Sequence, residues 1–351
     1  MRQTRNDTLA TDAWAGCRVL VTGGSGLLGS HLVRRLVALG AQVSVVAKAT
    51  TDLEKIADCL DHVDVLRGNL AVRSDVVRVT HDAQPQVIFH LAAAGVSPFQ
   101  ADPDTMVTTN VLGLMHLFEA LADVPYARFV NTGSCFEYGN QSGPLSEEHP
   151  LTPLNAYAAS KIMAWHLCQL HARQTGKPMV TLRLFTFFGP WERPDRLIPS
   201  TIRSVLQGEE IRITSGAQTR DYTYVEDVVD AYLRAAVMEQ AVGQTFNIGS
   251  GKEYAVREVA QRIRDLMQSQ APIRVGALKS RADEVWRLCC DSSKATAILG
   301  WRPTVSFDEG LHRTLEWMRP RAAADVLLGS GPGSGSCDSG KPREALHTRD
   351  V

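Results

Sequence analysis

Tyr157 and Lys161 are the first candidates for chemistry, because their types and spacing suit a proton transfer. They stand four residues apart in AYAASKIMAWHL, so a helix places both on the same face. A lysine ammonium beside a phenol favours the phenolate and lowers the pKa of the phenol. Such a phenol can give or take the proton of a carbinol while a nicotinamide exchanges a hydride at the same carbon. The other interpretation is an ordinary pair on a helix surface.

A second cluster lies in NTGSCFEYGN, residues 131–140, which brings Ser134, Cys135, Glu137 and Tyr138 into five positions. A cysteine nucleophile, a carboxylate base and a hydroxyl that donates a hydrogen bond belong to different enzymes. The residue types alone do not choose among them.

Three glycines follow the apolar run CRVLVTG at equal spacing. Gly23, Gly26 and Gly29 are three residues apart, where a strand is expected to turn into a helix. This arrangement lets the backbone approach a pyrophosphate and places the phosphates at a helix N-terminus. The spacing is GxxGxxG, which differs from the common GxGxxG, and a tight turn is the alternative interpretation. The predicted phosphate-binding residues are Gly23, Ser25, Gly26, Leu27, Leu28 and Gly29.

The end of the second expected strand selects the ribose of the cofactor. Sites for NAD usually carry an acid there, about twenty residues beyond the glycines, to hold the 2′-hydroxyl. This chain has VSVVAKATTD, with Ala47 and Lys48 in the place of the acid. An ammonium attracts a 2′-phosphate, so Lys48 favours NADP. The alternative is that Lys48 is a solvated lysine and that Asp52 approaches the ribose of NAD.

Short apolar runs alternate with helical segments from residue 17 onward, which predicts an α/β fold with a doubly wound parallel sheet. Several runs are apolar at nearly every position, as expected for strands covered on both faces. After Gly189 the alternation breaks, which indicates a smaller α+β lobe. The expected parts are an N-terminal tail (1–15), a dinucleotide-binding domain (16–182, with 220–248 returning to it), a substrate-binding lobe (183–219 and 249–318) and a disordered tail (319–351).

Composition narrows the class of protein. The chain has 351 residues with 37 basic and 38 acidic side chains and no long block of one sign, so no nucleic-acid partner is expected. No apolar run approaches the roughly 20 residues that span a bilayer, and the first fifteen residues lack the core of a signal peptide. The seven cysteines form no CxxC pair and no ligand spacing, so no metal site is expected. A cytoplasmic location is the default expectation.

The chain resembles an extended short-chain dehydrogenase/reductase of the nucleotide-sugar epimerase/dehydratase type, over roughly residues 16–318. The resemblance implies a Rossmann-type fold. The segments that carry it are VTGGSGLLGSHL, HLAA (90–93), NVLG (110–113), YAASK (157–161), RLFTFFGP (183–190), RDYTYVEDVVDAY (220–232), FNIGSG (246–251) and DSSKATAILGWRP (291–303).

The resemblance implies that Ser134 is the catalytic hydroxyl, which hydrogen-bonds the reacting sugar oxygen beside Tyr157. Dehydratases of the family follow this hydroxyl with an Asp-Glu pair, where this chain has Cys135 and Phe136, so dehydration is disfavoured. Strand alternation is expected to turn Cys135 to the opposite face, as a buried small hydrophobe at the edge of the substrate site. Glu137 is left as a possible substrate-side acid without an assigned role.

The resemblance also places the remaining contacts. Asn69 and Leu70 are expected near the adenine, Leu91, Ala92 and Ala93 near the nicotinamide, and Asn110 is expected to fix the helix that carries NVLG. On the substrate side Thr186 replaces the usual Asn, and Arg220 and Arg281 resemble the arginines that hold a nucleotide diphosphate. Either arginine could instead pair with Asp221, Asp227 or Asp283.

Lys48 favours NADP, and NADPH suits a reductase, which consumes reduced cofactor. We therefore expect an NADPH-dependent reductase that acts on a nucleotide-linked 4-keto-deoxysugar. The alternative is an NAD-dependent nucleotide-sugar 4-epimerase, and a dinucleotide-sensing regulator without catalysis is the third interpretation. A homodimer is expected through a four-helix interface formed by helices at Thr108–Val124 and Ala156–Thr175.

Overall fold

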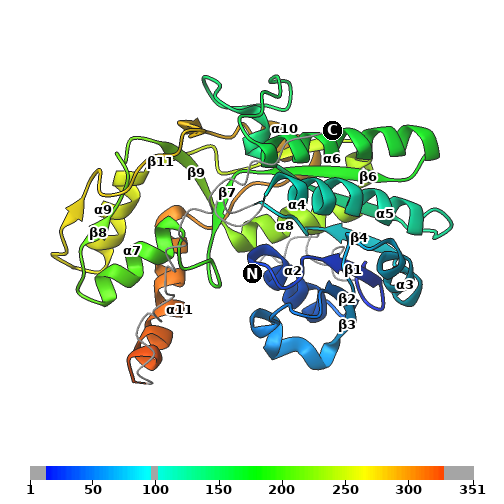
Figure 1. The fold of residues 1–351 in the computed structure, drawn as a ribbon, viewed down its shortest axis with the longest axis horizontal. Coiled ribbons are helices and arrows are strands. Elements are labelled where there is room, and N and C mark those ends of the chain that lie inside the picture. Colours follow the sequence, from blue (N-terminus) through cyan, green and yellow to red (C-terminus); the bar gives the residue numbers. More distant parts are fainter. Residues whose placement is uncertain (1–12, 96–101, 328–351) are drawn as a thin grey trace, which may run out of the picture.

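The computed structural model describes residues 13–95 and 102–327 and is built around one parallel sheet. Seven strands lie in the order β10-β6-β5-β4-β1-β2-β3, and every neighbouring pair is parallel (Figure 1). Because β1 lies between β4 and β2, the chain reverses its direction of winding there, which is where α/β sheets of this kind bind ligands. The strands are β1 Arg18–Thr22, β2 Gln42–Ala47, β3 Val63–Arg67, β4 Val87–His90, β5 Arg128–Ser134, β6 Met179–Leu184 and β10 Thr245–Ile248.

Helices cover both faces of this sheet. One hydrophobic cluster joins α2 and α8 to one face, and a second joins α3, α5 and α6 to the other. The central strands are buried at nearly every position, which explains the apolar runs in β1 and β4. The bounds are α2 Leu27–Ala38, η1 Glu54–His62, α3 Arg73–Ala83, α4 Pro103–Val107, η2 Thr108–Leu112, α5 Gly113–Ala120, η3 Cys135–Tyr138, α6 Ala156–Thr175, α8 Val225–Val237, η4 Glu239–Ala241 and α10 Ser293–Leu299.

A smaller lobe lies beside the carboxyl ends of the strands, to the left in Figure 1. Its four-stranded sheet has the order β11-β9-β13 with β7 paired to β9, and β8 pairs with β12. Phe188, Tyr222 and Phe307 pack together in its core. The elements are β7 Thr186–Phe188, α7 Leu197–Leu206, β8 Ile211–Arg212, β9 Thr219–Tyr224, β11 Glu253–Ala255, α9 Val256–Leu266, β12 Ile273–Arg274, β13 Arg287–Leu288 and α11 Phe307–Leu327.

The doubly wound sheet is as predicted from the sequence, and helix α6 has the expected bounds. The helix expected over Thr108–Val124 is different: α4, the π-helical turn η2 and α5 follow one another without a break from Pro103 to Ala120. It begins earlier because the Asp102 carboxylate accepts the Thr105 N–H at 2.9 Å, with proline at the first helical position.

Both ends of the chain carry more structure than expected. Trp14, in the segment expected as a tail, is 1% exposed and packs 6.0 Å from Phe89 in the core beneath the sheet. Helix α11 continues to Leu327, so the segment expected to be disordered from residue 319 begins as a helix. Residues 1–12 and 328–351 lie outside the described part of the chain.

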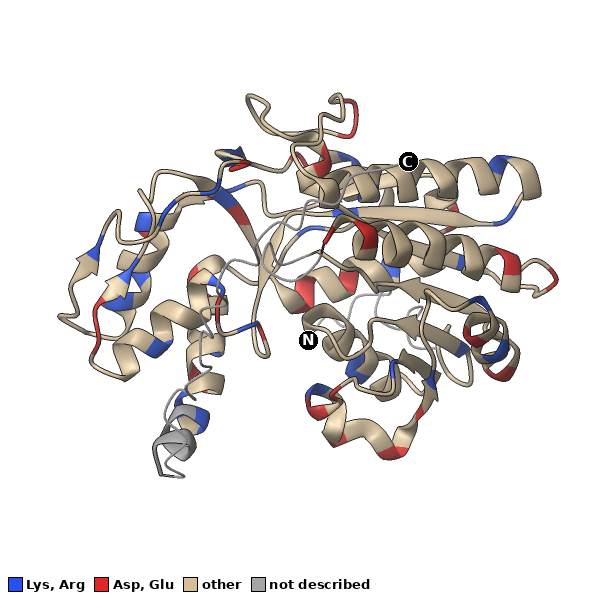
Figure 2. Cartoon of the chain, in the orientation of Figure 1, with Lys and Arg blue, Asp and Glu red and all other residues tan. Residues whose placement is uncertain are grey.

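Charges of both signs are interspersed over both lobes (Figure 2). In the described ranges, no helix is long and apolar enough to cross a membrane. The same residues contain no group of three or more His, Cys, Asp or Glu side chains that could hold a metal ion.

Candidate active site

The glycine turn between β1 and α2 is shaped to receive phosphates. Gly23 has φ +74°, and a Cβ there would lie 2.7 Å from the Ala92 nitrogen, while a Cβ on Gly29 would collide with the Gly23 carbonyl. Gly26 caps α2 without a side-chain hydrogen bond, and no acid stands in the first turn. The first amides of α2 are therefore open to an anion, so the residues present fit the pyrophosphate of a dinucleotide.

The residues that follow β4 are hydrogen-bonded to the end of β1 and, through Asn110, to helix α6. Thr22 Oγ1 accepts the Ala92 N–H at 3.2 Å and lies 2.8 Å from His90 Nδ1. Asn110 brackets Ala94, accepting from its N–H at 2.8 Å and donating to its carbonyl at 3.0 Å. The Asn110 amide also donates to Ser160 Oγ at 2.9 Å. The predicted segment Leu91–Ala93 thus lies between the glycine turn and helix α6.

Two exposed cations stand at the ends of β2 and β3. Lys48 follows the last residue of β2, and Arg67 Nη1 donates to the Lys48 carbonyl oxygen at 2.9 Å. Among the described residues no acid pairs with either side chain. Asp52, the alternative ribose ligand, instead accepts the Glu54 N–H at 2.8 Å at the start of η1. Arg67 was not singled out from the sequence, since only the pairing of Ala47 with Arg67 in adjacent strands brings it there.

Asn69 is turned partly toward its own backbone. The side-chain oxygen of Asn69 accepts the Ala71 N–H at 3.1 Å, and the backbone N–H of Asn69 donates to Asp75 Oδ2 at 2.9 Å. Leu70, the second residue expected near the adenine, is buried against α5 beside Gly113.

The predicted catalytic residues converge at the carboxyl end of β5. Ser134 ends β5, and its side chain is hydrogen-bonded to that of Tyr157 on α6. Ser134 and Lys161 are 6% and 3% exposed, whereas Tyr157 keeps some exposed surface. Asn155 caps α6 by accepting the Ala158 N–H at 2.9 Å, which fixes where the helix begins. The hydroxyl and the phenol can therefore address one substrate oxygen.

The expected lowering of the Tyr157 pKa is wrong for this state of the protein. Burial of its hydroxyl raises the pKa of Tyr157, and the hydrogen bond from Ser134 opposes this effect only in part. Burial also lowers the pKa of Lys161 to about 8, while the Glu137 carboxylate raises it. Tyr157 is thus a neutral phenol, which suits a proton donor.

Cys135 is buried as expected, but the reason given from the sequence is wrong. The strand ends at Ser134, and Cys135–Tyr138 form the 3-10 turn η3, so strand alternation does not set the direction of Cys135. Burial raises the pKa of the thiol to about 12, and Cys135 packs in an apolar cluster with Phe185 and Cys290. A protonated, enclosed thiol is a poor nucleophile.

Glu137 is not a substrate-side acid. It is 0% exposed, accepts the Ser134 N–H at 2.6 Å and accepts Arg183 Nε at 2.7 Å. Arg183 Nη1 also donates to the Tyr138 hydroxyl at 3.2 Å. The pair joins residues 46 positions apart, and no local sequence signal marks it.

The substrate side holds the predicted arginines. Arg220, on β9, forms an ion pair with Glu284 rather than with the aspartates considered from the sequence. Asp221 instead accepts backbone N–H groups of Gly251 and Cys290 at 2.8 and 3.0 Å.

Arg281 is exposed, but desolvation by its surroundings lowers its pKa, while Glu284 and Asp283 raise it. Arg196, which was not predicted, acts electrostatically on both Arg281 and Tyr157. The neighbouring Asp283 accepts from Asn155 Nδ2 at 2.8 Å, so this loop is tied to the start of α6. Arg196 and Arg220 thus both act electrostatically on Arg281, and Arg196 also acts on Tyr157.

Thr186 begins β7 and pairs with Tyr222 of β9. It is partly exposed at the start of the smaller lobe, two residues beyond the end of β6.

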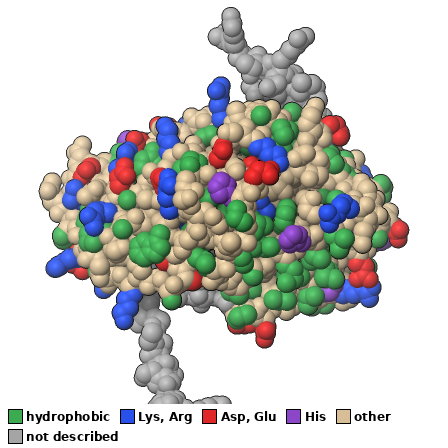
Figure 3. All heavy atoms as spheres, turned by 90° about the horizontal axis from the view of Figure 1, so that it is seen from above, with side chains coloured by type: hydrophobic (Ala, Val, Ile, Leu, Met, Phe, Trp, Pro, Cys, Tyr) green, Lys and Arg blue, Asp and Glu red, His purple; other side chains and the backbone are tan. Residues whose placement is uncertain are grey.

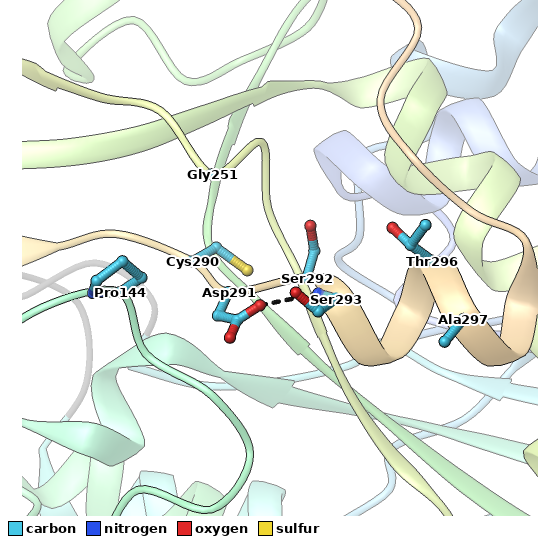
Figure 4. A pocket seen from close by; sticks show the side chains of 8 residues that line it. All are labelled: Pro144, Gly251, Cys290, Asp291, Ser292, Ser293, Thr296 and Ala297. Carbon is cyan, nitrogen blue, oxygen red and sulfur yellow. Dashed lines mark hydrogen bonds between the residues drawn. The ribbon is translucent and has the colours of Figure 1, made fainter.

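A separate hollow of about 540 Å³ opens beside α10 (Figure 4). Its lining residues are Pro144, Gly251, Cys290, Asp291, Ser292, Ser293, Thr296 and Ala297. The carboxylate of Asp291, one of these lining residues, accepts the Ser293 N–H at 2.9 Å. None of the predicted site residues lines this hollow, so the candidate active site is the one at the end of β5.

Comparison with known proteins agrees with this geometry. A family model described as the NAD dependent epimerase/dehydratase family matches residues 19–249. The dTDP-glucose 4,6-dehydratase of Xanthomonas campestris pv. campestris (strain B100) is 29% identical over 324 residues, which cover 85% of this chain and 92% of that protein. The UDP-glucose 4-epimerase of Mycolicibacterium smegmatis is 30% identical over 315 residues, which cover 87% of this chain and 99% of that protein.

A solved structure shows the same architecture. The UDP-glucose 4-epimerase of Thermus thermophilus, in complex with NAD, superposes with a TM-score of 0.78 at 28% identity, covering 86% of this chain and 99% of that one. Because the family model spans most of the chain, this protein belongs to the NAD-dependent epimerase/dehydratase family of nucleotide-sugar enzymes.

Proposed function

We propose that the protein reduces a nucleotide-linked 4-keto-(deoxy)sugar with NADPH. The observation that carries the proposal is the convergence of Ser134, Tyr157 and Lys161 at the carboxyl end of the sheet, in front of an open phosphate-binding turn. Relatives named as acting on dTDP-glucose and UDP-glucose support a nucleotide sugar as the substrate class.

The residues of the chain divide the work as follows. Leu91–Ala93 would hold the nicotinamide of a bound cofactor, which in its reduced form would supply a hydride to the carbonyl carbon of the sugar. Tyr157 donates its phenolic proton to the oxygen at that carbon, and Ser134 holds this oxygen by a hydrogen bond. Lys161, as an ammonium ion, stabilises the phenolate that remains.

The arginines fix the other end of the substrate. Arg220 and Arg281 are proposed to hold the diphosphate, since guanidinium groups match phosphate oxygens in pairs; Arg220 would then exchange its ion pair with Glu284 for the phosphate. Arg196 lies near enough to Tyr157 to favour ionisation of the phenol. We therefore propose that Arg196 contacts the phosphate nearest the sugar.

The cofactor preference rests on the ends of β2 and β3. Lys48 and Arg67 present two positive charges where a 2′-phosphate is expected, and the Asp52 carboxylate accepts the Glu54 N–H. This arrangement favours NADPH over NADH, although the structure of the Thermus thermophilus relative contains NAD.

A 4-epimerase with NAD is the second candidate, and the two epimerase relatives favour it. The expectation that dehydration is disfavoured receives no support from the relatives, because a 4,6-dehydratase is 29% identical to this chain. Cys135 and Phe136 still stand where the acid/base pair is expected, so the assay must distinguish dehydration by product. A sensor without catalysis has no use for the assembled hydroxyl, phenol and ammonium.

A homodimer through α5 and α6 is part of the proposal. Figure 3 shows hydrophobic side chains gathered over the region of these helices. The exposed apolar residues of η2, α5 and α6 are Leu112, Met115, Met163 and Leu170. Exposed apolar side chains gathered on one surface are typical of an association surface, which supports the proposed homodimer.

Tyr157→Phe tests the proposed chemistry. A panel of nucleotide sugars and keto-sugars is incubated with NADH and NADPH, and products are read by nicotinamide absorbance and by mass. The variant is expected to lose about 10²- to 10⁴-fold in turnover, because the proton donor is gone, while dinucleotide binding is nearly unchanged. Turnover retained with binding lost would contradict the assignment. A wild-type protein that binds dinucleotide but converts no sugar would favour the sensor.

A further inference from the structure

Glu137 lies in an enclosure built for a carboxylate. It is completely buried at the end of β5, and Gly133 leaves room for it, since a Cβ on Gly133 would lie 2.8 Å from Glu137 Oε1. Oε1 accepts the Ser134 N–H at 2.6 Å, and Oε2 accepts Arg183 Nε at 2.7 Å. Each carboxylate oxygen therefore has a defined donor, as buried ionic groups require.

Arg183 is itself fixed on the far side of the pair. Its guanidinium lies 4.7 Å from the centre of the Trp165 ring and 5.2 Å from that of Tyr138. The Tyr138 hydroxyl in turn donates to Asn247 Oδ1 at 2.7 Å. Glu137 thus cannot move without disturbing strands β6 and β10 as well as the turn that follows Ser134.

In the described part of the chain, the titratable groups coupled to Lys161 are His90, Glu137 and Cys168. His90, on β4, is neutral because burial lowers its pKa to about 3, and burial raises the pKa of the Cys168 thiol on α6. Tyr157 is neutral for the same reason. Glu137 is the carboxylate that acts on Lys161; burial raises the pKa of Glu137, while Arg183 and the Ser134 N–H lower it.

We propose that Glu137 is a positioning residue for the reaction: its carboxylate accepts the Ser134 N–H and so fixes the backbone that carries the Ser134 hydroxyl, and its negative charge stabilises Lys161 as an ammonium ion. This inference rests on the proposed function, because it assigns a role through Ser134 and Lys161. It goes beyond that function by placing a buried ion pair beneath the catalytic residues as part of the machinery. Glu137 does not touch the substrate.

The sign of the effect follows from the charges. An attractive carboxylate makes the ammonium form of Lys161 more stable, so removing it lowers the pKa of Lys161. The same carboxylate opposes ionisation of Tyr157, so its removal also lowers the pKa of the phenol. Cys135 raises the pKa of Tyr157, as Glu137 does, whereas Arg196 lowers it. The substitution of Glu137 leaves both Cys135 and Arg196 in place. The whole pH profile is therefore expected to move toward lower pH.

Glu137→Gln tests the role of the charge, because the amide oxygen can still accept the Ser134 N–H. The pH dependence of kcat is expected to move down by about one pH unit. A second readout needs no turnover: competitive labelling of Lys161 with acetic anhydride, followed by mass spectrometry across pH, reports the Lys161 titration in the protein alone. Its midpoint is expected to fall by the same amount.

Two further variants separate charge from structure. Glu137→Asp keeps the charge but shortens the reach to Ser134, so kcat is expected to fall while the pH profile stays near that of the wild type. Asp227→Asn is the matched control, since Asp227 is also buried and accepts the Thr304 and Val305 N–H groups at 3.0 Å, but lies outside the site. It is expected to lower stability without moving the profile.

An unchanged Lys161 titration in a folded Glu137→Gln protein would overturn the proposal. If that variant does not fold, Glu137→Gln combined with Arg183→Met removes both buried charges, and a smaller shift in the same direction is expected, because loss of the Arg183 cation partly offsets loss of the carboxylate. Absence of turnover in the wild type would refute the proposed function instead, while the labelling curves would still decide the role of Glu137.

Discussion

Lys48→Asp is expected to reverse the cofactor preference from NADPH to NADH. A 2′-phosphate carries roughly 1.5 to 2 negative charges near neutral pH. One ammonium about 4 Å away contributes about 1 kcal/mol in water and about 4 kcal/mol near a protein surface. Lys48 is exposed, so desolvation is slight and solvent screening is strong, which brings the contribution toward the lower figure.

The magnitude follows from these limits. A net advantage of about 1.4 kcal/mol for NADPH corresponds to a tenfold preference. Aspartate removes this attraction and adds a repulsion of similar size, so a total change of about 100-fold is expected, leaving NADH preferred about tenfold. The hydrogen bond from Arg67 goes to the backbone oxygen of Lys48, so it survives the substitution. Arg67→Gln is expected to weaken NADPH binding alone, by a few-fold.

The assay is a fluorescence titration that gives Kd for NADH and NADPH at low and at physiological salt. Because exposed charges are screened over about 8 Å at 0.15 M salt, the NADPH preference is expected to shrink as salt rises. Lys252→Asp is the control, since Lys252 is an exposed lysine of the other lobe. Equal loss of both cofactors in Lys48→Asp would show that Lys48 does not meet the phosphate. A wild type that prefers NADH would favour the 4-epimerase.

Two more predictions concern the hydroxyl and the subunit contact. Ser134→Ala should lower kcat by about 10- to 100-fold through loss of a hydrogen bond to the reacting oxygen, whereas Cys135→Ala should be mild, as measured by steady-state kinetics. Strong inactivation of Cys135→Ala, or of the wild type by thiol alkylation, would instead make the cysteine a catalyst. Met163→Glu should convert the dimer to a monomer in light scattering at micromolar concentration, because Met163 is 47% exposed on α6 within the apolar patch. A wild type that is already monomeric would refute the dimer.

Local sequence patterns predicted the parts of the fold that local physics determines. Strands such as β4 are buried on both faces and so are apolar at consecutive positions. Asn155 caps the start of helix α6 with its side chain, and Gly176, which has φ +69°, follows the last residue of the helix. The glycine turn was predictable because Gly23 and Gly29 are needed where backbones nearly touch.

Contacts between distant segments were not predictable in this way. Glu137 and Arg183 meet only because β5 and β6 are neighbours, and Arg67 reaches Lys48 only through the pairing of β2 with β3. The expected pKa of Tyr157 was wrong because a spacing of four residues shows the nearby charge but not the burial, and burial dominates.

The start of α6 is where the cofactor side and the substrate side of the site meet. Asn110, which brackets Ala94 beside the expected nicotinamide position, holds Ser160. Asn155 is held by Asp283, two residues from Arg281 on the substrate side. Both contacts act within one turn of Tyr157, so movement of either binding loop displaces the phenol directly. A group that must transfer a proton within hydrogen-bond reach gains from such double anchoring, because a displacement of about 1 Å can cost about 100-fold in rate.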